Sequence, residues 1–161
     1  EATTEEVTTE DAHPGETYNE LTGEWSADFE NKRPVAVMIN NIKEALPSSC
    51  TKQADIIYEC MVEGGITRLL AIFSDYDELE KIGSVRSARH YFLDYALEND
   101  AIYVHHGWSP QAEGDIKRLN INNINGITES EKAFWRVKDK SAPHNAVTST
   151  KKILKIAERK K

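Results

Sequence analysis

The sequence has no long hydrophobic run and few cysteines. No stretch approaches the roughly 18 to 20 apolar residues that a membrane-spanning helix needs, so we expect no such helix. Cys50 and Cys60 do not have the spacing of zinc ligands, and we expect neither a metal nor a cofactor. A disulfide between them remains open. No G-x-S-x-G elbow, P-loop or H-E-x-x-H motif occurs, so no local motif assigns an enzyme class.

Basic residues are in the minority. Lysine and arginine number 20 against 27 acidic residues, which gives a formal net charge of −7. A nucleic-acid-binding domain needs a basic field to neutralise phosphates, so we expect no nucleic-acid partner. The acidic residues are concentrated before residue 31, which leaves the rest of the chain close to neutral. A local anion site in that part therefore remains open.

The first 30 residues are rich in Thr, Glu and Asp and poor in apolar side chains. Such a segment cannot bury enough apolar surface to offset the entropy lost on ordering. We expect a disordered acidic tether over residues 1–30. Apolar runs are frequent beyond it, so residues 31–161 are expected to form a single α/β domain that is large enough to bury a core.

Four apolar, β-rich segments predict strands, at 34–39, 55–62, 67–74 and 101–105. The second and third are joined by Gly64-Gly65, a dipeptide that supplies the positive φ angles of a two-residue turn. We therefore expect a hairpin over residues 55–74. Another short strand is predicted at 134–137, and residues 120–127 form a loop or a short strand.

The predicted hairpin has a definite register. With Gly64-Gly65 as the turn, Glu63 lies opposite Ile66, Met61 opposite Arg68 and Glu59 opposite Leu70. Since directly opposed residues share a face and faces alternate along a strand, Glu59, Glu63 and Arg68 should point the same way. The two carboxylates would suit acid/base catalysis, and they would equally suit a structural ion-pair network, which we favour. A slip of one residue would break this grouping.

Helical periodicity and capping residues predict three helices. The first covers about 86–99, with Ser84 or Ser87 as its cap. The second covers 110–119, because Ser109-Pro110 combines a capping residue with proline at the first helical position. The third covers 149–160, with Thr148 or Ser149 as its cap. With the strands, these helices predict a mixed α/β fold.

The start of the first predicted helix is a candidate anion site. Arg86, Ser87 and Arg89 would lie at a helix N-terminus, where free N–H groups and the helix dipole favour an anion. Arginine adds a planar donor fork for phosphate or carboxylate. An alternative of equal weight is that these arginines pair with Glu59 or Glu63.

Two histidines lie in further polar segments. His105 ends a predicted strand, and Ser109 follows just before the second helix, a place where ligands often bind. His144 and Asn145 lie in a loop before the last helix, where they could hold a substrate or simply order the loop. Catalysis would use Glu59 or Glu63 with His105 or His144.

Long strings of this sequence resemble the YerB-like lipoproteins of Gram-positive bacteria. They are RPVAVMINN (33–41), ADIIYECMVEGGITRLLAIF (54–73), EKIGSVRSARHYFLDYALENDAIYVHHGWSP (80–110) and KSAPHNAVTST (140–150). The resemblance implies a layered α/β sandwich with a mixed sheet, a signal peptide, a lipid-modified cysteine upstream and an outward-facing location. It also implies a C-terminal domain beyond this N-terminal one. It implies no established activity.

The sequence departs from the family pattern at two positions. Asn40 stands where the family has aspartate, before Asn41, and Cys50 stands where glycine is usual. An acid acting at position 40 is therefore missing here. We retain Asn40 and Asn41 as candidate ligand-binding residues because they form the polar end of the first predicted strand.

Three functions remain open. In the first, the domain binds an anionic small molecule, envelope polymer or partner protein through Arg68, Arg86, Arg89 and their neighbours. Alternatively, it is a hydrolase or transferase acting on an envelope polymer or phosphoester, or a scaffold in an envelope complex. We favour binding, because no catalytic motif occurs. Its own C-terminal domain is an expected partner, and the membrane is contacted only through the upstream lipid anchor.

Overall fold

The computed structural model describes residues 12–129 and 132–159. The chain divides into two compact units, Glu1–Asn31 and Lys32–Lys161, each of which is described by itself. Within the described residues, no helix has both the length and the apolar character needed to cross a bilayer.

The first unit contains a short antiparallel pair, β1 (Thr17–Asn19) and β2 (Glu24–Ser26). Tyr18 lies opposite Trp25, and their ring centroids are 5.1 Å apart. This pair differs from the expectation of a tether without structure up to residue 30, because cross-strand aromatic contacts can hold a short ribbon. Residues 1–11 lie outside the described residues, and for them the tether stays a prediction.

The second unit is built around a five-stranded mixed sheet in the order β4-β5-β3-β7-β8. Its central strand β3 (Val35–Asn40) is buried at every position. It runs antiparallel to β5 (Thr67–Phe73) and parallel to β7 (Ile102–His105). The edges are β4 (Ile56–Met61), antiparallel to β5, and β8 (Asn123–Asn125), parallel to β7. The expected mixed α/β fold is thus present, with all four long predicted strands in this sheet.

A second, three-stranded antiparallel sheet has the order β6-β10-β9. It comprises β6 (Ile82–Gly83), β10 (Ala146–Thr148) and β9 (Trp135–Arg136). Only β9 was predicted, as part of the strand expected at 134–137. β6 and β10 have two and three residues, which is too short to show an alternating pattern.

Four α-helices accompany the sheets in the described residues: α1 (Tyr91–Glu98), α2 (Pro110–Arg118), α3 (Gly126–Glu129) and α4 (Thr150–Arg159). Further 3-10 turns include η1 (Lys43–Ala45), η2 (Thr51–Gln53) and η3 (Glu63–Gly65). The predicted second and third helices match α2 and α4, apart from residue 160, which lies outside the described residues.

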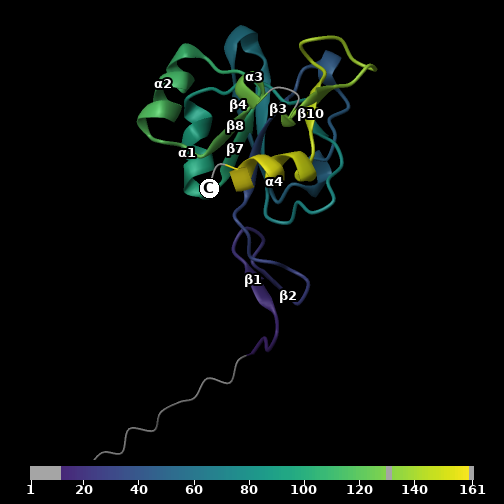
Figure 1. Cartoon of the computed structure of the whole chain (residues 1–161), viewed down its shortest axis with the longest axis vertical. Coiled ribbons are helices and arrows are strands. Elements are labelled where there is room, and N and C mark those ends of the chain that lie inside the picture. The colour runs from purple at the N-terminus through teal and green to yellow at the C-terminus, as the bar shows by residue number, and fades with distance from the viewer. Residues whose placement is uncertain (1–11, 130–131, 160–161) are drawn as a thin grey trace, which may run out of the picture. The chain divides into compact units, whose positions relative to one another are not determined.

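Both faces of the large sheet are covered. One face packs with α4 and the small sheet in a core that includes Val37, Phe73, Ile153 and Ile156. The opposite face lies against α1, where the rings of Tyr58 in β4 and Tyr95 in α1 stack at 4.3 Å. Figure 1 shows α1 and α2 together, apart from α4. The result is a layered arrangement of helices and sheets.

The hairpin formed by β4 and β5 has a different register from the predicted one. Its turn holds three residues, Glu63–Gly65, and the Val62 N–H donates to the Ile66 carbonyl at 2.8 Å. Cys60 therefore lies opposite Arg68, and Glu59 opposite Leu69. This slip of one residue places Glu59 and Arg68 on opposite faces, so the predicted grouping of Glu59, Glu63 and Arg68 is wrong.

The first predicted helix also starts later than expected, at Tyr91 rather than near residue 86. Residue 90 precedes it without a side-chain cap, so neither Ser84 nor Ser87 caps a helix. The residues before α1 instead make backbone hydrogen bonds with distant strands. These long-range pairings override a helical periodicity that covers only the later part of the segment.

Candidate functional site

The candidate site is built on residues 84–90, here called the crevice segment. β3 and β7 pair only as far as Val37, and beyond it the segment enters between them. The Arg86 N–H donates to the Met38 carbonyl at 3.0 Å, and the Arg86 carbonyl accepts from the His106 N–H at 3.0 Å. The segment thus occupies the crevice at the carboxyl ends of two parallel strands, where ligand sites of α/β proteins are common.

The serine hydroxyls of this region fix the backbone. Ser84 Oγ donates to the His144 carbonyl at 2.6 Å, and Ser87 Oγ donates to the His106 carbonyl at 3.0 Å. Ser109 caps α2 as predicted, because its Oγ accepts from the Ala112 N–H at 3.2 Å. Ser87 and Ser109 therefore have structural partners in this geometry, and they position the crevice segment and α2.

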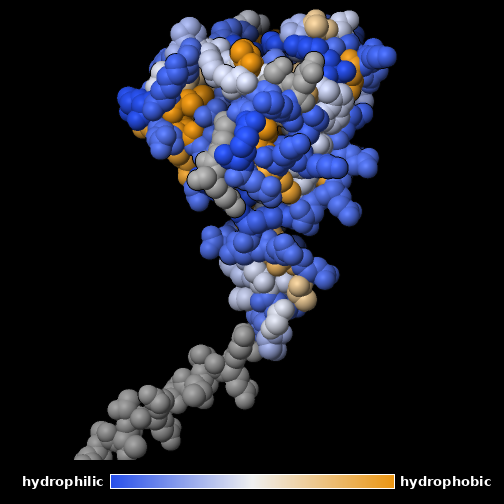
Figure 2. All heavy atoms as spheres, in the orientation of Figure 1, coloured by the Kyte–Doolittle hydropathy of each residue, from blue (hydrophilic) through white to orange (hydrophobic). Residues whose placement is uncertain are grey.

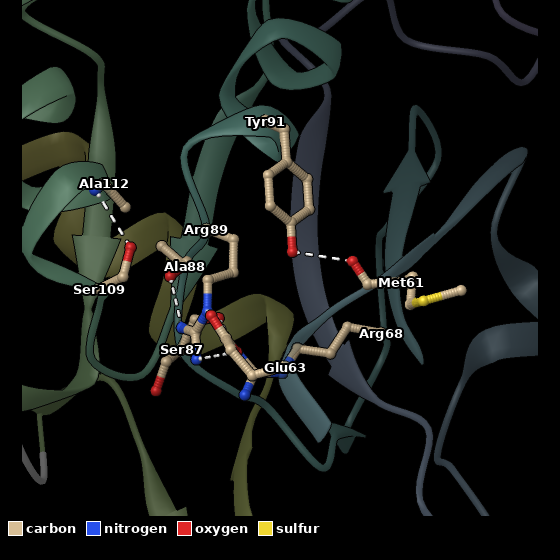
Figure 3. A network of polar contacts seen from close by, with 9 residues as sticks. All are labelled: Met61, Glu63, Arg68, Ser87, Ala88, Arg89, Tyr91, Ser109 and Ala112. Carbon is tan, nitrogen blue, oxygen red and sulfur yellow. Dashed lines mark hydrogen bonds and ion pairs between the residues drawn. The ribbon is translucent and has the colours of Figure 1, made fainter. Parts of the chain in front are cut away.

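Arg68 reaches the crevice segment from β5. Its side chain is buried, and Nη1 donates to the Ser87 carbonyl at 2.6 Å (Figure 3). Nε is buried without a hydrogen-bond partner in the described part of the chain. Burial, followed by the positive charges of Arg89 and Arg86, lowers the pKa of Arg68 to about 10. The guanidinium remains charged at neutral pH, but its surroundings are electropositive.

Arg89 forms the main ion pair of the site. Its Nε donates to both Glu63 oxygens at 2.7 and 3.0 Å, and its Nη2 donates to one of them at 2.8 Å (Figure 3). These hydrogen bonds are the main reason that the pKa of Glu63 falls to about 2. Glu63 is therefore ionised at neutral pH and poorly suited to act as a general acid. The pairing of Arg89 with Glu63 was one of the two predicted alternatives.

Arg86 differs from its neighbours. Its side chain is half-buried, yet it makes no hydrogen bond or ion pair with any residue that the structure describes. Burial lowers its pKa, and the positive charges of Arg89 and Arg136 lower it further. We call Arg68, Arg86, Arg89 and Glu63 the arginine cluster. It holds three guanidinium groups and one carboxylate, and among the described residues Arg86 is its cation whose side chain has neither a hydrogen bond nor an ion pair.

Two residues outside the predicted site lie within electrostatic range of Arg86. Arg136 in β9 donates to Asn145 Oδ1 at 2.7 Å. His106 is half-buried, and its pKa is lowered by burial, then by Arg136 and by Arg86. His106 follows the predicted residue His105 directly, whereas nothing in the local sequence marks Arg136.

The loop before β10 contains His144 and Asn145. Asn145 donates to the Val137 and Lys140 carbonyls at 3.0 and 3.1 Å, so it orders its own loop. The buried Asn40 amide lies 2.9 Å from His144 Nδ1 and donates to it. Asn40 and His144 therefore join the end of β3 to this loop.

The four proposed catalytic residues are held by separate sets of neighbours. Glu59 Oε1 accepts from Thr67 Oγ1 at 2.6 Å and from Asn41 Nδ2 at 3.1 Å, on the sheet face opposite Arg68. His105 is fully buried, with Nδ1 2.8 Å from the Gly107 carbonyl and Nε2 3.2 Å from Asn123 Oδ1. Glu63 contacts Arg89, and His144 contacts Asn40. The structure does not bring these groups together as a catalytic pair.

Cys50 and Cys60 are both free thiols. Among the described residues, no group of three or more His, Cys, Asp or Glu side chains is arranged to hold a metal ion. What the site offers chemically is therefore a set of guanidinium donors at the carboxyl end of parallel strands.

Comparisons with known proteins place the chain in a wider context. The family described as "Protein of unknown function (DUF3048) N-terminal domain" matches residues 21–161. "Putative lipoprotein YerB" of Bacillus subtilis (strain 168) is 44% identical over 129 residues, which cover 80% of this chain and 39% of that protein. The crystal structure of the YerB protein from Bacillus subtilis matches with a TM-score of 0.84 and 41% identity, covering 89% of this chain and 50% of that one. The chain thus spans half or less of these relatives, and the predicted fold class is confirmed.

Proposed function

The chain belongs to the family of the DUF3048 N-terminal domain, as its resemblance to YerB-like proteins predicted, and on this premise we propose that it is an outward-facing lipoprotein domain that binds an anionic ligand through the arginine cluster. The family description names no function. The binding activity is therefore argued from the geometry of the site.

The observation that carries the proposal is that Arg86, in a group of three arginines with one carboxylate, has no side-chain partner among the described residues. Positive charges that lie close together in a partly buried site repel one another more strongly than in water. Here that repulsion contributes to the lowered pKa of both Arg68 and Arg86. An anion bound at Arg86 would remove this repulsion and supply the acceptors that the guanidinium lacks.

The chemistry of the cluster favours phosphate or carboxylate. A guanidinium presents two parallel N–H groups that match two oxygens of either group. Arg136 adds a second guanidinium close enough to influence Arg86 electrostatically. A doubly charged phosphate monoester would therefore gain more than a single carboxylate.

The location is inferred from the relative. Its printed description is that of a lipoprotein, a class of protein that is held at a membrane by acyl chains. We propose the same for this protein, with a signal peptide and a lipid-modified cysteine upstream of Glu1. Its ligand would then be an anionic component of the cell envelope.

Thermal unfolding in the presence of inorganic phosphate tests this function. A ligand that binds only the folded state raises Tm by mass action, so phosphate should raise the Tm of the wild-type chain. Losing a charge-assisted hydrogen bond costs about 1.5–3 kcal/mol, so Arg86→Gln should weaken phosphate binding roughly 10- to 100-fold. Lys117→Gln removes an equal charge from an exposed pair on α2 and is the control. The proposal fails if phosphate has no effect, or if both variants bind it equally.

A further inference from the structure

A second cationic surface lies on α4, a helix that contributes no residue to the arginine cluster. Ile153 and Ile156 are buried and fix this helix on the core. Lys151 and Lys155 are exposed, and Lys152 is half-buried. Lys151 and Lys155 are four residues apart, so they lie on one helix face with an axial separation of about 6 Å.

Two adjoining hollows run along this surface. One has a volume of about 420 Å³ and is lined by Lys132, Trp135, Ser149, Lys151, Lys152 and Lys155. The other, of about 690 Å³, shares three of these lysines and continues to Glu158 and Arg159. We call this surface the lysine groove. Figure 2 shows that hydrophilic side chains predominate on the face of the second unit that carries α4.

Most of the lysine charges in this groove are not compensated within the described residues. Lys132, Lys151 and Lys155 have no ion-pair partner there. Lys152 Nζ lies 5.9 Å from the centroid of the Trp135 ring and 3.4 Å from the Lys132 carbonyl. Arg159 is paired with Glu129. Among the lining residues, Glu158 carries a carboxylate, and the lysines outnumber it. The groove is therefore basic, although the net charge of the chain is −7.

We propose that the lysine groove binds a linear polyanion with phosphodiester repeats. Ammonium groups on mobile stems act as point charges for phosphate and do not demand one geometry. Several such groups in an elongated hollow can contact successive phosphates of one chain, and tethered contacts reinforce one another. This site shares no residue with the arginine cluster, so it does not depend on the function proposed above.

Two other polyanionic partners fit the groove less well. A helix that lies on a membrane inserts an exposed apolar face, whereas Ile153 and Ile156 of α4 are 0% and 1% exposed. Single-stranded nucleic acids stack their bases on open aromatic rings, whereas Trp135 is half-buried with Lys152 over its ring. A phosphodiester chain without bases is therefore the favoured occupant.

Titration calorimetry of the full chain with a poly(glycerol phosphate) oligomer tests this inference. The wild-type chain should bind, and the double variant Lys151→Gln/Lys155→Gln should bind at least tenfold more weakly. The salt dependence, log K against log of salt concentration, should become shallower by about 1.4 for two lost contacts. Lys117→Gln/Lys138→Gln removes two lysines elsewhere and should leave binding unchanged. Far-ultraviolet circular dichroism verifies that α4 persists in each variant.

Other results would overturn the inference. It fails if the double variant binds the oligomer as the wild type does, or if the wild type does not bind. Equal or tighter binding of phosphatidylglycerol vesicles or of oligo(dT) would assign the groove to a membrane or to nucleic acid instead. Arg86→Gln separates the two sites, because it should leave oligomer binding intact. If only Arg86→Gln abolishes it, the oligomer binds at the arginine cluster.

Discussion

Arg86 and Arg89 lie three positions apart on the crevice segment, yet their surroundings differ. Arg89 is held by the Glu63 carboxylate, and its side chain is only 14% exposed. Arg86 has no such partner in the described part of the chain. An arginine that is fully paired mainly braces a structure, whereas one with free donors can take up a ligand. At this scale, Arg86 is the residue to change first.

The Glu63–Arg89 pair should make stability depend on pH in the acid range. Folding lowers the pKa of Glu63 from about 4.5 to about 2. The pair therefore stabilises the fold above pH 4.5, and this contribution is lost as the pH falls from 4.5 to 2. Since Glu63 is 67% exposed, the contribution should be about 1 kcal/mol or less. Urea unfolding should show Glu63→Gln less stable than wild type at pH 7 and equal at pH 2. A difference that is constant with pH would contradict this.

His106 reports on the charges around Arg86. Burial and the positive charges of Arg136 and Arg86 lower its pKa below 6.5. Because Arg136 is the largest of the charged causes, Arg136→Gln should raise the pKa of His106. Phosphate bound at Arg86 should raise it as well, since an anion stabilises the imidazolium. Nuclear magnetic resonance titration of the His106 ring measures both effects. An unchanged pKa in Arg136→Gln would show that the two side chains do not interact.

At the scale of elements, the strands were more predictable than the site. The run at 34–39 is apolar because β3 is buried on both faces, so composition alone identifies it. The start of α1 was not predictable from residues nearby in the sequence. The backbone N–H groups of Arg86 and Ala88 donate to the carbonyls of residues 38 and 107, which lie far away along the chain. The hairpin register was missed because Gly64-Gly65 fits a two-residue turn and also a three-residue turn that includes Glu63. The candidate site depends on both features, which is why its grouping was predicted only in part.

Replacing each of two glycines with alanine should change the stability of the fold in opposite directions. A Cβ at Gly126 would lie 2.3 Å from His106 Cδ2, so Gly126→Ala should displace the ring and cost about 1–3 kcal/mol. A Cβ at Gly114 in α2 would meet no atom within 4 Å, so Gly114→Ala should stabilise the helix by about 1 kcal/mol. Chemical denaturation of both variants measures the two changes. A neutral Gly126→Ala would mean that the His106 ring does not lie against Gly126.

At the scale of the whole molecule, the chain is acidic, but its arginine cluster and lysine groove are basic. Net charge argues against a general nucleic-acid surface, yet it does not reveal local cationic sites. The arginine cluster lies where β5, η3 and the crevice segment meet, and the lysine groove lies along α4. Both sites would favour anionic partners.

A crystal structure of the chain grown with phosphate tests the central claim most directly. Our account predicts phosphate in contact with the Arg86 guanidinium, with the Arg89–Glu63 pair retained beside it. A crystal in which Arg86 contacts no phosphate while phosphate occupies other surfaces, or in which Arg86 turns to a carboxylate of its own chain, would contradict the account.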